Sequence, residues 1–248
     1  MPDGKVAVVT GAGAGIGRAV ALAFAARGYR LALIGRTRAS LEETGVLCRE
    51  DALALSADVG DELAVDQAFA QVLRAYGRVD VLFNSAGLFG AGAPFDQVSL
   101  DDWRRVIDTN LTGSFLCARA AFRQMKAQSP VGGRIINCGS ISAHAPRPTT
   151  VAYTASKHAI TGLTRSIALE GRAFGVACGQ LDIGNAATGM TDTFSKGTLQ
   201  ADGSLKPEPM MDVANVADAA IFMAELPPEA NVLFMTVMAT AMPFVGRG

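Results

Sequence analysis

The segment KVAVVTGAGAGIGRAVALAF (residues 5–24) decides the class of fold into which the rest of the chain must fit. The β-branched run before Gly11 predicts a strand, and the apolar pattern after Gly17 predicts a helix. Strand, glycine loop and helix in this order bring backbone N–H groups and a helix N-terminus up to a phosphate. Gly11 permits a tight turn, while Gly15 and Gly17 let a pyrophosphate approach closely. The segment therefore predicts a dinucleotide site, with a turn that binds nothing as the alternative.

Strand and helix patterns alternate along the whole chain. After the first strand at residues 5–10, further strands are expected over residues 30–34, 52–56, 79–83, 134–138, 176–183 and 231–238. Between them, helices are expected over residues 39–50, 61–76, 101–128, 152–170 and 213–225. Because parallel strands need crossover connections, this alternation predicts an α/β fold with a doubly wound parallel sheet flanked by helices. The segment 186–211, rich in Gly, Thr, Pro and Met, predicts a substrate loop.

The composition favours small-molecule partners. The 248 residues carry a net charge of −1 with acidic and basic residues interspersed, which argues against nucleic-acid and anionic-membrane partners. No apolar stretch is long enough to span a bilayer, and the first residues do not form a secretory signal. The four cysteines lack the spacing of metal ligands, so we predict no metal site and a reducing compartment. We expect a cytoplasmic protein with a single domain, residues 1–248.

The second predicted strand ends in Gly35 and Arg36, where a dinucleotide fold places the adenosine ribose. An acidic residue there would bind the 2′-hydroxyl of NAD, whereas a cation accommodates the 2′-phosphate of NADP. Gly35 leaves the acidic position empty, and a guanidinium matches phosphate in charge and geometry, so Arg36 favours NADP(H). NAD(H) stays possible, as does an Arg36 that is merely solvated.

Polar residues follow two further predicted strands, and another lies within a predicted helix. Asp58 follows the third strand and Asn84 the fourth. Ligands bind at the carboxyl ends of strands in open α/β sheets, which makes both residues site candidates; capping a turn is the alternative role for each. Asn110 lies among apolar positions of the helix expected over 101–128, whose apolar side includes Phe115. A buried Asn must be hydrogen-bonded, so Asn110 could also serve structure alone.

A possible catalytic group lies between the fifth strand and the helix that follows it. Tyr153 and Lys157 are four residues apart on a predicted helix and therefore project from the same side. An ammonium beside a phenol favours the phenolate and lowers the pKa of the phenol toward the working range of a proton carrier. Ser140, at the end of the preceding strand, could add a hydrogen bond to a substrate oxygen. The Tyr-x-x-x-Lys pattern alone is short enough to arise by chance.

Together these motifs resemble the single-domain branch of the short-chain dehydrogenase/reductase family. The resemblance rests on Thr10-Gly11-x-x-x-Gly15-x-Gly17, Asn84-x-Ala86-Gly87, Asn110, Ser140 and Tyr153-x-x-x-Lys157 in this order, and it covers essentially the whole chain. It implies a Rossmann-like sheet of seven strands, usually in a homotetramer or homodimer. It also implies an NAD(P)(H)-dependent oxidoreductase that interconverts a secondary alcohol and a ketone by hydride transfer.

The resemblance assigns roles to particular residues. The catalytic set would be Asn110, Ser140, Tyr153 and Lys157, with Tyr153 moving the proton and Asn110 supporting a water in the relay. The cofactor would contact Gly11, Ala14, Gly15, Ile16, Gly17, Arg36, Asp58, Val59, Asn84, Ala86, Gly87, Tyr153, Lys157, Ala186 and Thr188. A catalytically silent dinucleotide sensor of the same fold is an alternative, which the intact catalytic set disfavours. An epimerase or dehydratase of the extended branch is disfavoured by the glycine spacing and by the absence of a C-terminal substrate domain.

Three positions depart from the family pattern. The usual Pro-Gly after the sixth strand is Ile183-Gly184, preceded by Asp182, and Gly139 stands before Ser140 where Ser is frequent. The terminal Asp-Gly-Gly is missing, which suggests an altered subunit contact or a tail that reaches a neighbouring active site. An apolar ligand is expected from the residues that we predict to line the pocket, which are Leu88, Phe89, Phe95, His144, Pro146, Met190 and Phe194. For His144 we favour a packing role over substrate contact, and for His158 a structural role.

Overall fold

The computed structural model describes residues 4–48, 52–191 and 197–245 and confirms the α/β class. Within these ranges, seven strands form a parallel sheet in the order β3-β2-β1-β4-β5-β6-β9. The strands are β1 (Val6–Thr10), β2 (Arg30–Gly35), β3 (Leu53–Ser56), β4 (Val81–Asn84), β5 (Gly133–Cys138), β6 (Val176–Ile183) and β9 (Phe234–Val237). The order reverses direction between β1 and β4, and such a switch point opens a crevice for a ligand.

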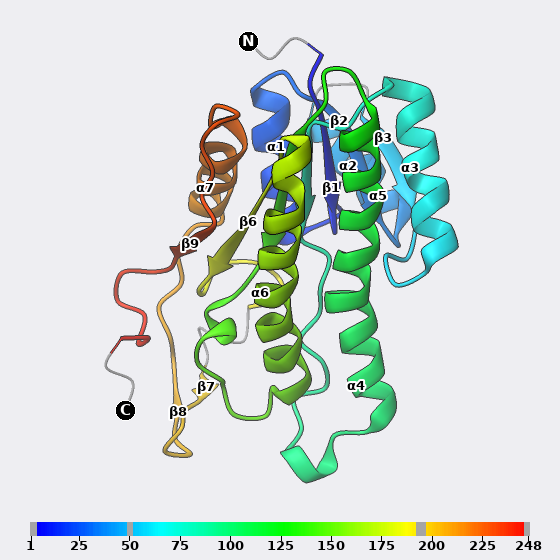
Figure 1. The fold of residues 1–248 in the computed structure, drawn as a ribbon. Helices are drawn as coiled ribbons and strands as arrows, with labels where there is room; N and C mark the ends of the chain where they lie inside the picture. The colour runs from blue at the N-terminus through cyan, green and yellow to red at the C-terminus, as the bar shows by residue number, and fades with distance from the viewer. Residues whose placement is uncertain (1–3, 49–51, 192–196, 246–248) are drawn as a thin grey trace.

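Helices cover both faces of the sheet (Figure 1). They are α1 (Gly15–Ala26), α2 (Arg38–Leu47), α3 (Glu62–Tyr76), α4 (Leu100–Ile107), α5 (Gly113–Ala127), α6 (Val151–Gly171) and α7 (Ala214–Glu225). One apolar cluster joins the sheet to α1 and α7, and a second joins it to α3 and α5. The sheet is therefore buried on both sides, which is why its central strands are continuous apolar runs rather than alternating ones.

The strand register brings the loops of the site to one edge. Thr10 at the end of β1 pairs with Ile34 of β2 and with Asn84 of β4. The Thr10 hydroxyl oxygen accepts hydrogen bonds from the backbone N–H groups of Ser85 and Ala86, at 3.0 and 3.1 Å. The loop after β4 is thereby held against the end of β1, beside the glycine loop.

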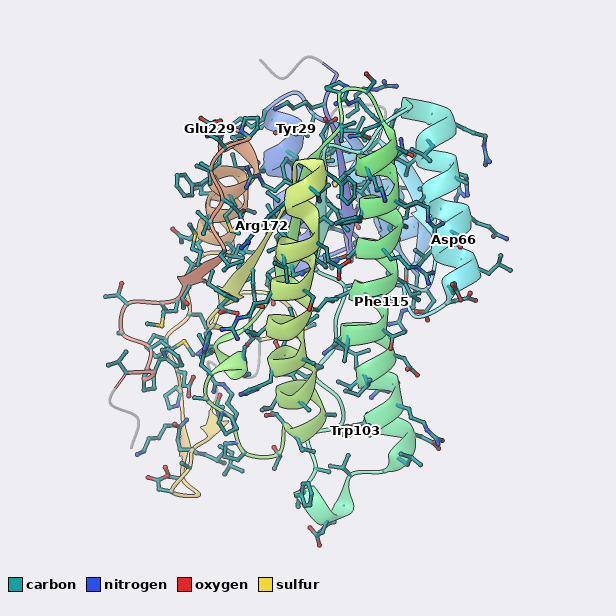
Figure 2. The ribbon with its side chains drawn as sticks, in the orientation of Figure 1. Tyr29, Asp66, Trp103, Phe115, Arg172 and Glu229 are labelled. Carbon is teal, nitrogen blue, oxygen red and sulfur yellow. The ribbon has the colours of Figure 1, made fainter. Side chains whose placement is uncertain are left out.

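The helix expected over 101–128 is divided in the structure. A π-helical turn, η2 (Asp108–Thr112), separates α4 from α5. A π turn spaces its hydrogen bonds one residue further apart than an α turn, so the residues after it are rotated relative to a regular helix. The prediction that Phe115 lies on the apolar side is accordingly wrong, because its side chain is 43% exposed and faces the guanidinium of Arg119. Figure 2 labels Phe115 on α5 and Trp103 on α4.

The segment 186–211 has more regular structure than its sequence indicates. Residues 198–206 form a short antiparallel hairpin of β7 (Thr198–Leu199) and β8 (Leu205–Lys206). Ala186 and Met211, the two ends of the segment, are joined by a parallel bridge. Phe194, predicted to line the pocket, lies outside the described residues. No helix in the described ranges has the length and apolar character needed to cross a membrane.

The C-terminal tail packs against the chain to which it belongs. Ala239 and Met242 are buried in a small apolar cluster with Ile141, which follows Ser140. The ring of Phe244 lies 6.4 Å from the ring of His144, measured between centroids. The described part of the tail thus supports the turn that carries Ser140.

Candidate active site

Two adjoining cavities open at the carboxyl edge of the sheet. The larger, about 420 Å³, lies between the glycine loop, the Ser140 turn, α6 and the loop after β6. The smaller, about 260 Å³, lies between the glycine loop and the loops that follow β2 and β3. Both are lined by Gly11, Ala14 and Gly87, so they are two parts of one elongated site.

The glycine loop leaves no room for side chains at Gly11 and Gly17. A Cβ at Gly17 would lie 2.3 Å from the carbonyl oxygen of Gly11, and a Cβ at Gly11 would lie 3.0 Å from the backbone of Ala86. Gly11 also has a φ of +65°, which residues with a Cβ rarely adopt. The result is a backbone cradle at the start of α1, which fits a pyrophosphate group.

Ser140 presents its hydroxyl to the larger cavity. Its side-chain oxygen accepts a hydrogen bond from the N–H of Ser142 at 3.1 Å. A hydroxyl has one proton to donate and two lone pairs with which to accept. Because one lone pair is occupied and no described residue accepts the proton, Ser140 is available to donate to a ligand oxygen.

Tyr153 and Lys157 project from α6 into the same cavity. The Lys157 amine lies 5.6 Å from the centroid of the Tyr153 ring and donates a hydrogen bond to the carbonyl of Cys138 at 2.7 Å. Lys157 is only 6% exposed, so this bond fixes a buried cation and leaves two of its protons for other acceptors. Phe89 packs against the Tyr153 ring, with 4.4 Å between centroids. Among the described residues, none is hydrogen-bonded to the Tyr153 hydroxyl.

Asn110, in the π turn, connects two parts of the site through its side chain. Its amide oxygen accepts from the N–H of Leu88, and its amide nitrogen donates to the Leu88 carbonyl and to the Ser156 hydroxyl. Ser156 in turn donates to the carbonyl of Tyr153 at 2.7 Å. The Asn110 side chain therefore joins the loop after β4 to α6, one residue from Lys157.

The remaining predicted cofactor residues fall into two groups. Those that line a cavity are Gly11, Ala14, Gly15, Ile16, Gly17, Arg36, Asp58, Val59, Ala86, Gly87, Ala186 and Thr188. Asn84 lines neither cavity, since it is 3% exposed and its amide nitrogen donates to Ser114 and Asn137. Its side chain braces β4 against β5 and α5.

The residues expected to contact substrate are also divided. Phe89 and Met190 line the larger cavity, whereas Leu88 lines the smaller one. Phe95, His144 and Pro146 line neither, which differs from the prediction. Phe95 is 80% exposed, on the short helix η1 (Phe95–Gln97).

A buried ion pair at the substrate end is absent from the residues predicted from the sequence. Arg147, which lines the larger cavity, makes two hydrogen bonds to the carboxylate of Glu208, at 3.0 and 2.7 Å. The two side chains are 7% and 1% exposed. Burial raises the pKa of Glu208, but hydrogen bonds from Arg147, Asn185 and Gln200 outweigh it and hold the pKa at about 2. No sequence pattern links these positions, which come together only when the chain folds.

Cys138 forms part of the wall of the larger cavity and does not act as a nucleophile. It lines the larger cavity, but burial raises the pKa of its thiol, and the nearby charge of Lys157 only partly offsets this. The reactive form of cysteine is the thiolate, which such an environment disfavours. What Cys138 contributes is the backbone carbonyl that holds Lys157.

Residues 5–199 match the family model described as short chain dehydrogenase. The chain belongs to the short-chain dehydrogenase family. Members are NAD(P)-dependent enzymes that interconvert alcohols and ketones, and this dehydrogenase is such an oxidoreductase; the alternative of a silent sensor is not favoured. Its substrate is a small molecule.

Three similar proteins illustrate the range of the family. A 3beta-hydroxysteroid dehydrogenase of Mediterraneibacter gnavus is 36% identical over 200 residues, which are 78% of this chain and 70% of the relative. The structure of a 3-ketoacyl-(acyl-carrier-protein) reductase from Brucella melitensis complexed with NADH has a TM-score of 0.86 and 25% identity, and the match covers 97% of this dehydrogenase and 99% of that chain. An alcohol dehydrogenase from Thermococcus sibiricus complexed with 5-hydroxy-NADP has a TM-score of 0.80 and 26% identity, with coverage of 96% and 97%.

Proposed function

We propose that this dehydrogenase reduces an uncharged, mainly apolar ketone to a secondary alcohol, and catalyses the reverse, with Ser140, Tyr153 and Lys157 as its catalytic residues. The observation that carries the proposal is the convergence of these three side chains on one cavity that also reaches the glycine loop. When bound, the nicotinamide supplies or accepts the hydride. Asn110 positions α6 through Ser156.

The chain's own residues handle the oxygen of the substrate. The Ser140 hydroxyl donates a hydrogen bond to the carbonyl oxygen, which fixes its position. The Tyr153 hydroxyl then transfers a proton to that oxygen as negative charge develops on it. The buried ammonium of Lys157 stabilises the phenolate that is left, because opposite charges attract strongly where water is excluded. In the oxidation direction the same proton returns to Tyr153.

The charge of the cavity wall supports an uncharged substrate. Arg147 is a cation of the wall that could attract a carboxylate, but Glu208 already neutralises it with two hydrogen bonds. Phe89, Ile141 and Met190 give the wall an apolar surface. A bound carboxylate would therefore lose water without gaining the Arg147 guanidinium as a free partner.

A turnover screen tests the proposed substrate class. Purified protein is mixed with NADPH or NADH and with linear, cyclic and aryl ketones, each paired with a keto acid of the same skeleton, and nucleotide absorbance is followed. We expect turnover of the neutral ketones and a preference of at least about tenfold in kcat/KM over the paired acids, corresponding to 1.4 kcal/mol. Faster turnover of the acids would contradict the assignment.

We also propose that NADP(H) is the preferred cofactor. Arg36 lines the smaller cavity at the start of α2, is exposed, and has no ion-pair partner among the described residues. The Thr37 side chain makes no capping hydrogen bond to α2, and both Thr37 and Ser40 line the same cavity. A phosphate bound there would interact with the Arg36 guanidinium, with the hydroxyls of Thr37 and Ser40, and with the N-terminus of α2.

Replacing Arg36 with alanine should weaken NADPH binding by about tenfold, because an exposed charge-assisted hydrogen bond is worth roughly 1 to 2 kcal/mol. NADH binding should change by less than about twofold, since NADH carries no 2′-phosphate. Arg38→Ala is the matched control, because Arg38 is paired with Glu42 and does not line the cavity. Titration by fluorescence checks both nucleotides. Tighter binding of NADH than NADPH by the unmodified protein would overturn the preference.

The family resemblance supports a homotetramer or homodimer in the cytoplasm as our further expectation. Phe115 on α5 and Leu169 on α6 are exposed apolar side chains in this single chain, as expected for helix faces that another subunit covers in an assembly. Cys117, Cys138 and Cys178 are free thiols, as expected in a reducing compartment. Sedimentation at several protein concentrations tests the assembly, and a monomer at all of them would contradict it.

A further inference from the structure

A buried carboxylate lies directly behind the Ser140 turn. Asp182, near the end of β6, is 1% exposed. One of its oxygens accepts the backbone N–H of Ser140 at 3.1 Å and the side-chain amide of Gln180 at 2.7 Å. Its other oxygen lies 2.7 Å from Nε2 of His144. We assign His144 as the donor of this bond and the carboxylate oxygen as its acceptor.

These bonds hold the turn at both ends. Ser140 begins the turn and His144 ends it, with η3 (Ile141–Ala143) between them. Within the turn, the N–H of Ala143 donates to the carbonyl of Ser140, and that of His144 donates to Ile141. A single carboxylate on the neighbouring strand therefore fixes the turn whose hydroxyl faces the cavity.

Two of the three departures of this chain from the family pattern belong to one arrangement. A Cβ at Gly139 would lie 2.0 Å from the Asp182 oxygen that accepts from Ser140. The carboxylate can occupy this place only because residue 139 has no side chain. Gly139 before the serine and Asp182 before Ile183-Gly184 are thus two halves of one arrangement.

The histidine does not act as a base toward the serine. Among the described residues, the Ser140 oxygen accepts from Ser142, and Nε2 of His144 is used on Asp182. The residue types of a hydrolytic triad are present, but without the serine–histidine hydrogen bond on which such a mechanism depends. The carboxylate contacts Ser140 only through the backbone.

We propose that Asp182, tied to His144, is a positioning residue that holds the Ser140 hydroxyl in place for the carbonyl oxygen of the substrate. The proposal rests on the proposed function, because it gives Ser140 a role in turnover. A shift of about 1 Å in a group that orients the substrate can cost about a hundredfold in rate. Loss of Asp182 should therefore act through Ser140 and nowhere else in the reaction.

A double-mutant cycle tests this dependence, with the ketone turned over fastest in the screen above as substrate. We expect Asp182→Ala to lower kcat by about ten- to a hundredfold, with the Kd for NADPH changed less than about twofold. Asp182→Asn keeps an oxygen that can accept the Ser140 N–H and should recover most of the loss. In a Ser140→Ala background, Asp182→Ala should lower kcat by less than about twofold, because a residue that acts through another adds nothing once that other is removed.

A second set of variants covers the case in which Asp182→Ala does not fold. His144 is 46% exposed, so His144→Ala removes one tie to the carboxylate at little risk to folding. It should lower kcat by about three- to tenfold, and again by less than about twofold in the Ser140→Ala background. His158→Ala is the matched control, because His158 is the only other histidine, is exposed, and bonds to the Thr154 carbonyl.

Hydrogen exchange gives a readout that is independent of turnover. The Ser140 amide should be protected in the unmodified protein and should exchange faster in Asp182→Ala, while the amides of the central strands keep their protection. Losses in kcat that multiply in the Ser140→Ala background, or an unchanged Ser140 amide, would overturn the positioning role. Unchanged turnover in Ser140→Ala and Tyr153→Phe would instead overturn the proposed function.

Discussion

Replacing Tyr153 with phenylalanine should lower kcat by at least about a thousandfold, because it removes the group that we propose as the proton donor. The ring packs against Phe89, and none of the described residues is hydrogen-bonded to its hydroxyl. Phenylalanine should therefore fill the same space without breaking a structural bond. The Kd for the reduced nucleotide should change by less than about threefold, since the glycine loop and the Arg36 region are untouched. Steady-state kinetics with the best ketone of the screen, and fluorescence titration, measure the two quantities.

Tyr29→Phe is the matched control for this experiment. Tyr29 precedes β2 at the end of the sheet away from the site, and its ring contacts Phe24 in the core (Figure 2). Its hydroxyl is buried, and no described residue is its hydrogen-bond partner. Removing such a group should leave kcat unchanged and the free energy of unfolding unchanged or higher. Turnover by Tyr153→Phe at the unmodified rate would show that the proton comes from another group.

The fold could be predicted because its signals are local. Each strand is a short apolar run, and each crossover helix has its own periodicity, so the order of elements can be recognised without any long-range contact. The glycine loop has the same property, since the approach of Gly17 to Gly11 involves residues six positions apart. The family resemblance adds the number of strands, seven. Element ends shifted by a few residues, as for β9, which is shorter than the strand expected over 231–238.

The π turn shows where periodicity misleads. A regular helix over 101–128 places Phe115 on the apolar side, but the turn at 108–112 changes the phase of the helix after it. The same turn brings Asn110 to the Leu88 loop and to Ser156. The π turn thus positions a residue of the site, and the apolar pattern of the sequence does not predict this turn.

The polar contacts behind the cavity could not be predicted because they join distant parts of the chain. Asp182 is 42 residues from Ser140, and Glu208 is 61 residues from Arg147. The sequence marks Asp182 only as a departure from a family pattern, and no motif includes Arg147. A buried charged group becomes recognisable through its partners, which the sequence does not reveal.

The Arg147–Glu208 pair should make the protein acid-sensitive. The pKa of Glu208 is about 2 in the folded chain against an ordinary value of 4.5. A carboxylate whose folded pKa is depressed adds stability above its unfolded pKa and loses it as the pH falls toward its folded pKa. We therefore expect about 3 kcal/mol of the free energy of unfolding to be lost between about pH 4.5 and 2 through this group. Urea unfolding followed by circular dichroism, at one protein concentration, measures it.

Glu208→Gln isolates the contribution of the pair. It should lower the free energy of unfolding at pH 7 by about 3 to 5 kcal/mol, since it leaves a buried Arg147 without its countercharge. It should also be less sensitive to acid than the unmodified protein, because the group that titrates is gone. Glu42→Gln is the control, since Glu42 is 54% exposed in a surface pair with Arg38 and should cost less than about 0.5 kcal/mol. Equal acid sensitivity in Glu208→Gln and the unmodified protein would mean that Arg147 does not hold Glu208 ionised, and that Glu208 does not neutralise Arg147 in the cavity wall as we propose.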